Sequence, residues 1–256
     1  MGGQLILNIN QTHIASKTNP QAAAQKVERK LPMERGIIGH LSYGLGMAYA
    51  RRIVHLRAEG LENIPDDAPY VIAANHETYV DGMLIASYLP KSHFKKFSCI
   101  AAKDLASRHG ILGRVILRVG RAIPIDRLGN PVRGLIIAKK KVDEGNIMLV
   151  HPEGTRSVDG RLGEMKEGAS YLSFKSRVPL LPVFIDGAYE VFNRYMKVPR
   201  GRDPVTGKKR EVILTFGKPF DPADFGNARE MTVALNNWMQ TRFQEKKIPR
   251  IYRHSD

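Results

Sequence analysis

Short apolar runs that alternate with helical patterns constrain this chain more than any other feature. The apolar runs lie at residues 70–74, 98–102, 122–125, 147–150, 180–185 and 212–216, and helical patterns lie between or after them at 79–88, 113–119, 131–144, 166–177 and 231–243. Strands that are apolar throughout are typical of parallel sheets, whose two faces are both covered by helices. We therefore predict an α/β fold with a mostly parallel central sheet flanked by helices.

The segment before this alternation has a different pattern. Residues 1–32 are polar and end at Pro32, which predicts an arm with a helix over residues 20–30. In residues 33–56, Ile38, Leu41, Leu45 and Ala48 recur at helical spacing, which favours a packed surface helix or one lying in a membrane interface. We predict an N-terminal arm and amphipathic helical segment over residues 1–57, followed by a catalytic domain over 58–256.

No membrane-spanning segment or signal peptide is predicted. The uncharged stretch of residues 36–50 is shorter than the ~20 residues that a spanning helix needs. The start of the chain lacks the basic region of a signal peptide. With 40 basic against 25 acidic residues, the formal net charge is +15, which attracts nucleic acid, an anionic membrane or a phosphorylated substrate. The single cysteine, Cys99, excludes an internal disulfide, and no Cys/His cluster has the spacing of zinc ligands, so we predict no metal.

The first candidate site directly follows the run at residues 70–74. His76 and Asp81 are five residues apart, and on one continuous helix they would point ~140° apart. They can meet only if His76 lies before the helix or at its start. A histidine oriented by a carboxylate is a general base, and a substrate hydroxyl that it deprotonates can then attack a thioester. Taken alone, a His/Asp pair at this spacing is also common by chance.

Two further segments carry groups suited to anions. Glu153, Gly154, Thr155 and Arg156 follow the run at residues 147–150, where glycine permits close backbone approach and arginine offers a bidentate fork for phosphate. Arg127 follows the run at 122–125 and is a candidate for binding an anion. A surface ion pair and a solvated arginine are the structural alternatives. Prolines in and beside the run at 180–185 suggest an edge strand or a wall beside a cleft, with structural packing as the default interpretation.

Taken together and in order, the segments NHETYVD, GRAIPIDR, HPEGTRS and VPLLPV resemble the four blocks of the glycerolipid acyltransferase family. That family includes glycerol-3-phosphate and 1-acylglycerol-3-phosphate acyltransferases. The resemblance covers residues 63–187, about half of the chain. It implies that His76 is the catalytic base and Asp81 its partner.

The resemblance also implies binding roles and co-substrates. Arg127 matches the arginine that binds the acceptor phosphate, and Glu153, Gly154, Thr155, Arg156 and Lys166 match acceptor-binding positions. The expected acceptor is lysophosphatidic acid, and the donor is acyl-CoA or acyl carrier protein, with no cofactor. Two departures leave the acceptor open. The third block often begins with Phe where this chain has His151, and the second commonly has Gly where it has Arg121. Glycerol-3-phosphate or another lysolipid is the alternative acceptor.

Such a protein is expected at a membrane. We predict a peripheral protein on the cytoplasmic side of an anionic membrane, with residues 33–57 as the docking helix. A second candidate surface is formed by Lys91, Lys95 and Lys96 with Phe94 and Phe97. A nucleic-acid-binding protein is disfavoured because few aromatic residues accompany the basic clusters at 139–141 and 208–210. An inactive lipid-binding scaffold is disfavoured because His76 and Asp81 are both present.

Overall fold

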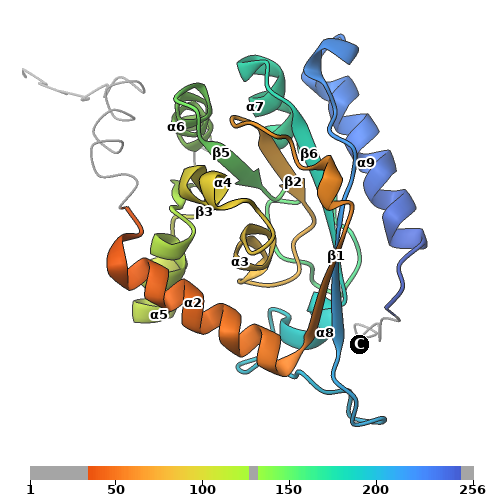
Figure 1. Ribbon diagram of the computed structural model, residues 1–256. Coiled ribbons are helices and arrows are strands. Elements are labelled where there is room, and N and C mark those ends of the chain that lie inside the picture. Colours follow the sequence, from red (N-terminus) through yellow and green to blue (C-terminus); the bar gives the residue numbers. More distant parts are fainter. Residues whose placement is uncertain (1–33, 127–131, 249–256) are drawn as a thin grey trace, which may run out of the picture.

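A twisted, mostly parallel sheet forms the centre of the computed structural model, which describes residues 34–126 and 132–248 (Figure 1). Within these residues the sheet has seven strands, in the order β1-β7-β6-β2-β5-β3-β4. Their bounds are β1 His55–Glu59, β2 Val71–Ala74, β3 Phe97–Ala102, β4 Ile123–Ile125, β5 Ile147–Val150, β6 Leu180–Asp186 and β7 Glu211–Phe216. All neighbouring pairs are parallel except β6–β7. The predicted α/β fold is confirmed.

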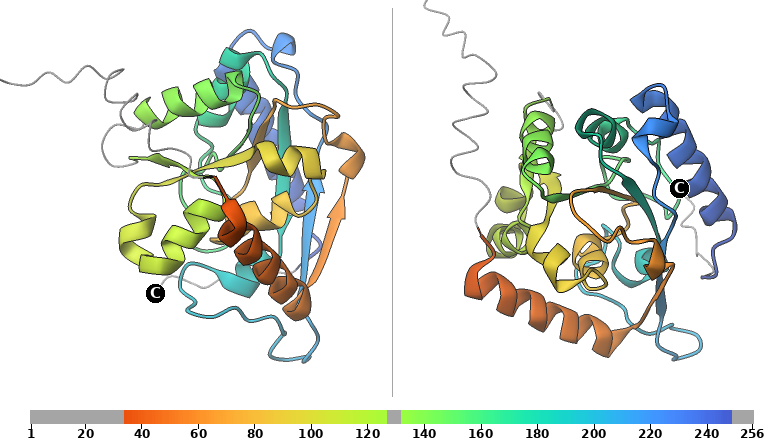
Figure 2. Two further views of the ribbon diagram at one scale, coloured as in Figure 1. Left: turned by 60° about the vertical axis from the view of Figure 1, so that its left-hand side comes forward. Right: turned by 45° about the horizontal axis from the view of Figure 1, so that its top comes forward.

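Helices cover both faces of the sheet (Figures 1 and 2). The described helices are α2 Gly36–Ile53, α3 Asp81–Ala86, α4 Lys91–Lys96, α5 Leu105–Val119, α6 Val132–Asp143, α7 Gly168–Ser176, α8 Ala188–Phe192 and α9 Ala228–Gln244. Helices α2, α3 and α8 share one core with Ile72 and Leu149. Helices α6, α7 and α9 share the other with Val71 and Met148. Successive strand residues point to opposite faces, so β2 and β5 contribute to both cores.

The sheet begins earlier in the chain than the sequence pattern suggested. Strand β1 has the sequence HLRAE and no fully buried residue, so it lacks the apolar run of an inner strand. It lies at the edge of the sheet and pairs with β7, with His55 opposite Glu211. The division expected between residues 57 and 58 falls inside this strand. The helix expected at residues 20–30 lies outside the described residues.

The two prolines of residues 179–182 do not mark an edge strand. Strand β6 lies between β7 and β2, so the expectation of an edge was wrong. Pro182 is tolerated because the β6–β7 ladder is interrupted beside it, between the Leu180–Phe220 bridge and the Val183–Phe216 pair. Its carbonyl still accepts the N–H of Gly217 at 2.9 Å. The missing N–H of proline therefore falls where the ladder requires no donor.

Helix α2 packs one face on the protein and exposes the other. Gly39 and Met47 are buried, whereas Ile38, Leu41 and Leu45 are 61%, 61% and 73% exposed. Its start is held by the buried guanidinium of Arg35, which donates hydrogen bonds to the carbonyls of Val119, Phe94 and Phe97. Burial lowers the pKa of Arg35 to about 10. The helix predicted for residues 33–56 is thus present, with its apolar stripe facing outward.

The second candidate membrane surface, at residues 91–97, has its aromatic side chains directed inward. Phe97 is 1% exposed, and the Phe94 ring packs on Tyr43 with 4.6 Å between centroids. Phe97 is therefore part of the core and Phe94 is half-buried against it, so a membrane contact at residues 91–97 would rest mainly on the lysines and stays a prediction. Residues 34–126 and 132–248 include no helix with the length and hydrophobicity required to span a bilayer.

Candidate active site

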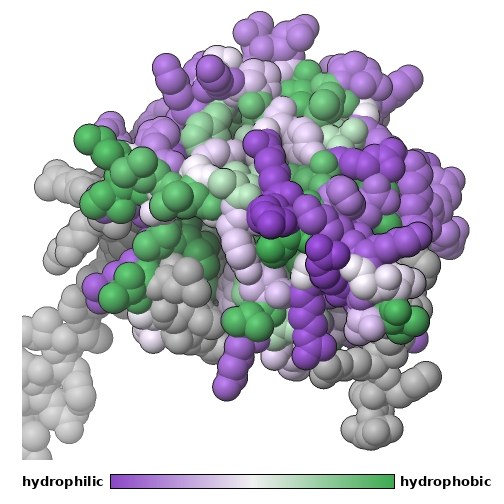
Figure 3. Space-filling model, turned by 60° about the horizontal axis from the view of Figure 1, so that its bottom comes forward, coloured by the Kyte–Doolittle hydropathy of each residue, from purple (hydrophilic) through white to green (hydrophobic). Residues whose placement is uncertain are grey.

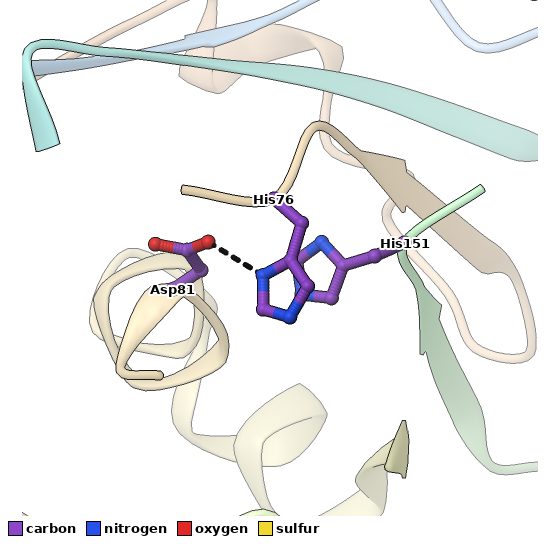
Figure 4. Close-up of side chains that lie close together, drawn as sticks. All are labelled: His76, Asp81 and His151. Carbon is purple, nitrogen blue, oxygen red and sulfur yellow. Dashed lines mark hydrogen bonds and ion pairs between the residues drawn. The ribbon is translucent and has the colours of Figure 1, made fainter. Parts of the chain in front are cut away.

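His76 lies in the short loop between β2 and α3, at the carboxyl end of the central strands. Helix α3 begins at Asp81, so the histidine precedes the helix, as the five-residue spacing requires. His76 Nδ1 lies 2.9 Å from Asp81 Oδ2 (Figure 4). In open α/β sheets, ligands bind at this carboxyl end of the strands. The structure therefore brings the first predicted pair together in the expected place.

Asp81 is a rigid and ionised partner. Its side chain is 0% exposed. Oδ2 also accepts the N–H groups of Glu77 and Thr78, and Oδ1 accepts the Thr78 hydroxyl at 2.7 Å. Burial by itself raises the pKa of Asp81, but the hydrogen bond and charge of His76, with His151 and Thr78, lower it below its ordinary value. The carboxylate therefore accepts a hydrogen from His76 Nδ1, which leaves the Nε2 lone pair as the base.

The second motif holds the backbone of His76 on both sides. Glu153 Oε1 accepts the His76 N–H at 2.8 Å, and the His76 carbonyl accepts the Ser157 N–H at 2.7 Å. The other Glu153 oxygen accepts the N–H of Gly163 at 2.8 Å. Glu153 is buried, and both of its oxygens bind backbone amides. This carboxylate therefore joins the two motifs, a role that the sequence pattern did not indicate.

His151 stacks on the ring of the predicted base. The two imidazoles lie 3.9 Å apart between centroids with 8° between their planes (Figure 4). His151 Nδ1 lies 3.0 Å from the carbonyl oxygens of both Ala74 and Asn75, so Nδ1 must carry the hydrogen. Burial, and then the proximity of His76, lower the pKa of His151 to about 3. His151 is therefore neutral. The family's frequent Phe at this position was the one signal in the sequence that a ring belongs here.

His76, Asp81 and His151 also meet the spacing of a candidate cation site, with one ligand atom from each within 4.8 Å of the others. Hydrogen bonds already occupy Asp81 Oδ2 and both Nδ1 atoms. The remaining lone pairs are those of the two Nε2 atoms. A structural or catalytic cation site normally uses three or more protein ligands. The arrangement thus fits a hydrogen-bonded base better than a metal site.

The glycine turn of the second motif contacts Lys166. Gly154 has φ +71°, a conformation that favours glycine, and a Cβ added there would lie 3.1 Å from Lys166 Nζ. The Lys166 backbone N–H bonds the Pro152 carbonyl at 3.0 Å. Thr155 is exposed beside this turn. These predicted binding residues therefore lie together.

Arg156 is positioned by an aromatic ring of the first motif. Its guanidinium carbon lies 3.4 Å from the centroid of the Tyr79 ring. A cation over an aromatic face at this distance is attracted by the ring's quadrupole. The pair connects the two motifs a second time and places the guanidinium over a residue of the loop that carries His76. Arg127 lies outside the described residues, so its phosphate-binding role stays a prediction.

Two buried side chains of the first motif support the loop. Asn75 exchanges hydrogen bonds with the backbone of Ile185, at 2.9 Å and 2.7 Å. Glu77 Oε2 accepts the N–H of Tyr189 at the start of α8, at 2.7 Å. These contacts tie the loop to β6 and α8. Sequence reasoning assigned neither residue a role, because their partners are more than 100 residues away in the chain.

The chain belongs to the Acyltransferase family, whose model matches residues 55–186. It is 29% identical over 185 residues to the protein named "Probable 1-acyl-sn-glycerol-3-phosphate acyltransferase" of Mycoplasma pneumoniae, covering 70% of this chain and 66% of that protein. It is 27% identical over 192 residues to the 1-acyl-sn-glycerol-3-phosphate acyltransferase of Bacillus subtilis, covering 72% and 84%. The predicted family membership is confirmed.

Its fold is similar to the crystal structure of the 1-acyl-sn-glycerophosphate acyltransferase PlsC from Thermotoga maritima. The TM-score is 0.62 at 24% identity, covering 91% of this chain and 83% of that one. Among curated relatives, the chain spans 66% of the M. pneumoniae protein and less than half of two chloroplast relatives.

Proposed function

We propose that this protein transfers a fatty acyl group from a thioester donor to the hydroxyl of lysophosphatidic acid. The observation that carries the proposal is the hydrogen bond from His76 Nδ1 to the buried Asp81 carboxylate. It directs the lone pair of Nε2 away from the dyad, and no hydrogen bond within the described residues uses that atom. The names of the relatives support lysophosphatidic acid as the acceptor.

The proposed reaction has two steps. His76 Nε2 removes the proton from the acceptor hydroxyl as its oxygen attacks the carbonyl carbon of acyl-CoA or acyl carrier protein. The tetrahedral intermediate then collapses, the C–S bond breaks, and the imidazolium returns its proton to the thiolate. Asp81 stabilises the imidazolium between the steps. Holding both substrates in place contributes much of the rate, and the mechanism uses no cofactor or metal.

The acceptor phosphate is proposed to bind Arg156 and Arg127, with Lys166, Gly154 and Thr155 beside it. Arginine suits this role because its planar fork binds two phosphate oxygens at once. The fixed position of Arg156 over Tyr79 supports the proposal. Glu153 contributes by positioning His76.

The protein is proposed to act as a peripheral membrane protein, because its acceptor is a lipid. The docking element is α2, whose exposed stripe consists of Ile38, Leu41, Leu45 and Tyr49. A helix of this kind lies in the interface with its apolar face among the acyl chains.

A screen of donors and acceptors, with lipid products identified by mass spectrometry, tests the proposal. Phosphatidic acid formed from lysophosphatidic acid is the expected product. Product from glycerol-3-phosphate alone would establish the alternative acceptor. Two results would overturn the assigned activity. One is that the thioester is consumed equally well without any acceptor. The other is that no donor and acceptor combination gives more thioester consumption with the wild type than with the His76→Ala control.

A further inference from the structure

Residues 193–210 connect α8 to β7 and end in a short hairpin, bridged by Arg202 and Lys209, and the whole segment is called the basic hairpin below. The segment contains one acidic residue, Asp203, and the basic residues Arg194, Lys197, Arg200, Arg202, Lys208, Lys209 and Arg210. Lys197, Arg200 and Lys208 have exposed side chains. The described ion pairs include one within the hairpin, from Arg210 to Asp203. A concentration of cations on one short segment produces a local field that attracts anions.

The tip of the hairpin is an ordered turn with an apolar end. Asp203 Oδ1 accepts the N–H groups of Val205 and Thr206 at 3.0 and 2.8 Å, and Arg202 forms a β-bridge with Lys209. Val205 is 90% exposed at this turn. The turn therefore holds an aliphatic side chain outward among lysines and arginines.

The hairpin adjoins both the candidate active site and the end of α2. Arg194 Nη1 donates to the Arg156 carbonyl at 3.3 Å. Gly201 packs against the last residue of α2 so closely that an added Cβ would lie 2.4 Å from the Ile53 carbonyl oxygen. The basic hairpin, the acceptor-binding motif and the docking helix therefore occupy one end of the molecule.

The exposed stripe of α2 leads toward the basic hairpin. After Leu45 and Tyr49 the helix ends with Arg51 and Arg52, both exposed. Figure 3 shows this end of the molecule, with hydrophobic side chains gathered on the left and hydrophilic side chains across the centre and right. The face thus changes along α2 from apolar to basic.

We propose that the basic hairpin binds the anionic headgroups of a phospholipid bilayer, as a second contact beside α2. The inference rests on the proposed function, since it assumes a bilayer as the source of the acceptor. Exposed aliphatic side chains beside cations favour the headgroup region of an anionic membrane, where each basic residue contributes to binding. An acidic protein would match the cations but not the apolar tip and stripe.

Vesicle binding by matched charge variants tests the inference. One variant carries Lys197→Gln, Arg200→Gln and Lys208→Gln. Its control carries Lys175→Gln, Lys218→Gln and Arg229→Gln, which are also exposed. Lys175 precedes β6 and Lys218 follows β7, so these two lie at the other end of the sheet. Both variants lose three positive charges, and their thermal unfolding is compared with that of the wild type.

Phosphatidylcholine vesicles containing phosphatidylglycerol are the probe. We expect the hairpin variant to bind at least tenfold more weakly than the control, since one basic residue near an anionic surface contributes about fivefold. The difference should vanish on pure phosphatidylcholine and shrink with salt. Equal binding by the two variants would overturn the inference.

A second measurement separates this inference from the proposed function. Transfer to a short-chain, water-soluble acceptor should be equal in the hairpin variant and the wild type, whereas transfer to vesicle-borne acceptor should fall. Absence of transfer in all proteins would refute the activity, while vesicle binding would still decide the role of the hairpin. Equal loss with both acceptors would place the hairpin in substrate binding instead and overturn the inference.

Discussion

The imidazole rings of His76 and His151 lie face to face, 3.9 Å apart and within 8° of parallel. The His151 ring is held at its Nδ1 edge by two backbone carbonyls, those of Ala74 and Asn75. The face of this fixed ring that stacks on His76 therefore limits rotation of the His76 ring. The base is thus oriented twice, in its plane by Asp81 and across its plane by His151.

The first prediction concerns acid stability. The pKa of His151 lies at about 3 in the folded protein against an ordinary 6.5. As the pH falls from 6.5 to about 3, His151 takes up a proton in the unfolded chain but not in the folded protein. The free energy of unfolding that neutral His151 contributes above pH 6.5 is therefore lost progressively toward pH 3. In His151→Phe this loss is absent.

Urea unfolding from pH 8 to pH 4 measures the effect. At pH 8 the variant should be slightly less stable, since two carbonyls lose a donor at a cost of about 1 kcal/mol. Toward pH 4 the wild type should lose on the order of 2–3 kcal/mol more than the variant. Parallel curves would show that His151 does not titrate in this way.

The second prediction concerns the dyad. His76→Ala should lower turnover by about 10²–10⁴-fold in a protein that still folds, because proton removal is lost while the Asp81 carboxylate keeps its hydrogen bonds to Glu77 and Thr78. Asp81→Asn should also be severe, because it removes the charge that stabilises the imidazolium. Steady-state thioester release measures both, and near-normal turnover in His76→Ala would refute the mechanism.

The third prediction distinguishes positioning from binding at Glu153. Glu153→Gln replaces one acceptor oxygen by an N–H₂ group that faces a backbone donor. We expect a loss of about 1–3 kcal/mol in unfolding free energy and a lower kcat. The acceptor KM should change little. A raised KM with unchanged kcat and stability would instead indicate direct contact between this carboxylate and the acceptor.

The fourth prediction concerns the phosphate. Arg156→Ala or Arg127→Ala should raise the acceptor KM strongly and the donor KM much less. Lysine at either position should restore acceptor binding only in part, because it lacks the bidentate fork of arginine. Tyr79 provides a matched pair of variants. Tyr79→Phe keeps the ring below Arg156 and should be nearly neutral, whereas Tyr79→Ala should raise the acceptor KM a few-fold. Equal effects on both substrates would refute the assigned role.

The fifth prediction concerns α2. Leu41→Gln with Leu45→Gln should weaken binding to anionic vesicles by more than tenfold, since each leucine buries apolar area in the interface. Val132→Gln with Val233→Gln is the control, because both valines are 55% exposed on helices of the opposite face of the sheet. Co-sedimentation compares the pairs, and equal binding would place the membrane surface elsewhere.

The sequence predicted β2 to β7 because each contains a run of mainly apolar residues. Strand β1 escaped prediction because an edge strand with exposed residues such as His55 and Arg57 has no apolar run. The position of β6 was misjudged because proline is normally excluded from inner strands. The interruption of the ladder beside Pro182 depends on β7, which begins 29 residues later, and no local pattern encodes it.

At the candidate site, the sequence predicted which residues meet but not how they are held. His76 and Asp81 are close in the chain, so their spacing alone restricted their geometry. Glu153 and His151 act across 77 and 75 residues, through a backbone amide and a ring face. Neither contact has a signature in residue type. Sequence reasoning therefore assigned Glu153 to the substrate and gave His151 no role.

Helix α2 is held at both ends. Arg35 binds three carbonyls at its start, and one residue after its end the chain enters β1, where His55 pairs with Glu211. A helix fixed in this way cannot tilt without moving the sheet. On a bilayer, the fold would then fix the height of His76 Nε2 above the acyl chains. Acceptors would be selected by the depth at which they carry a hydroxyl, before any side chain recognises their headgroup.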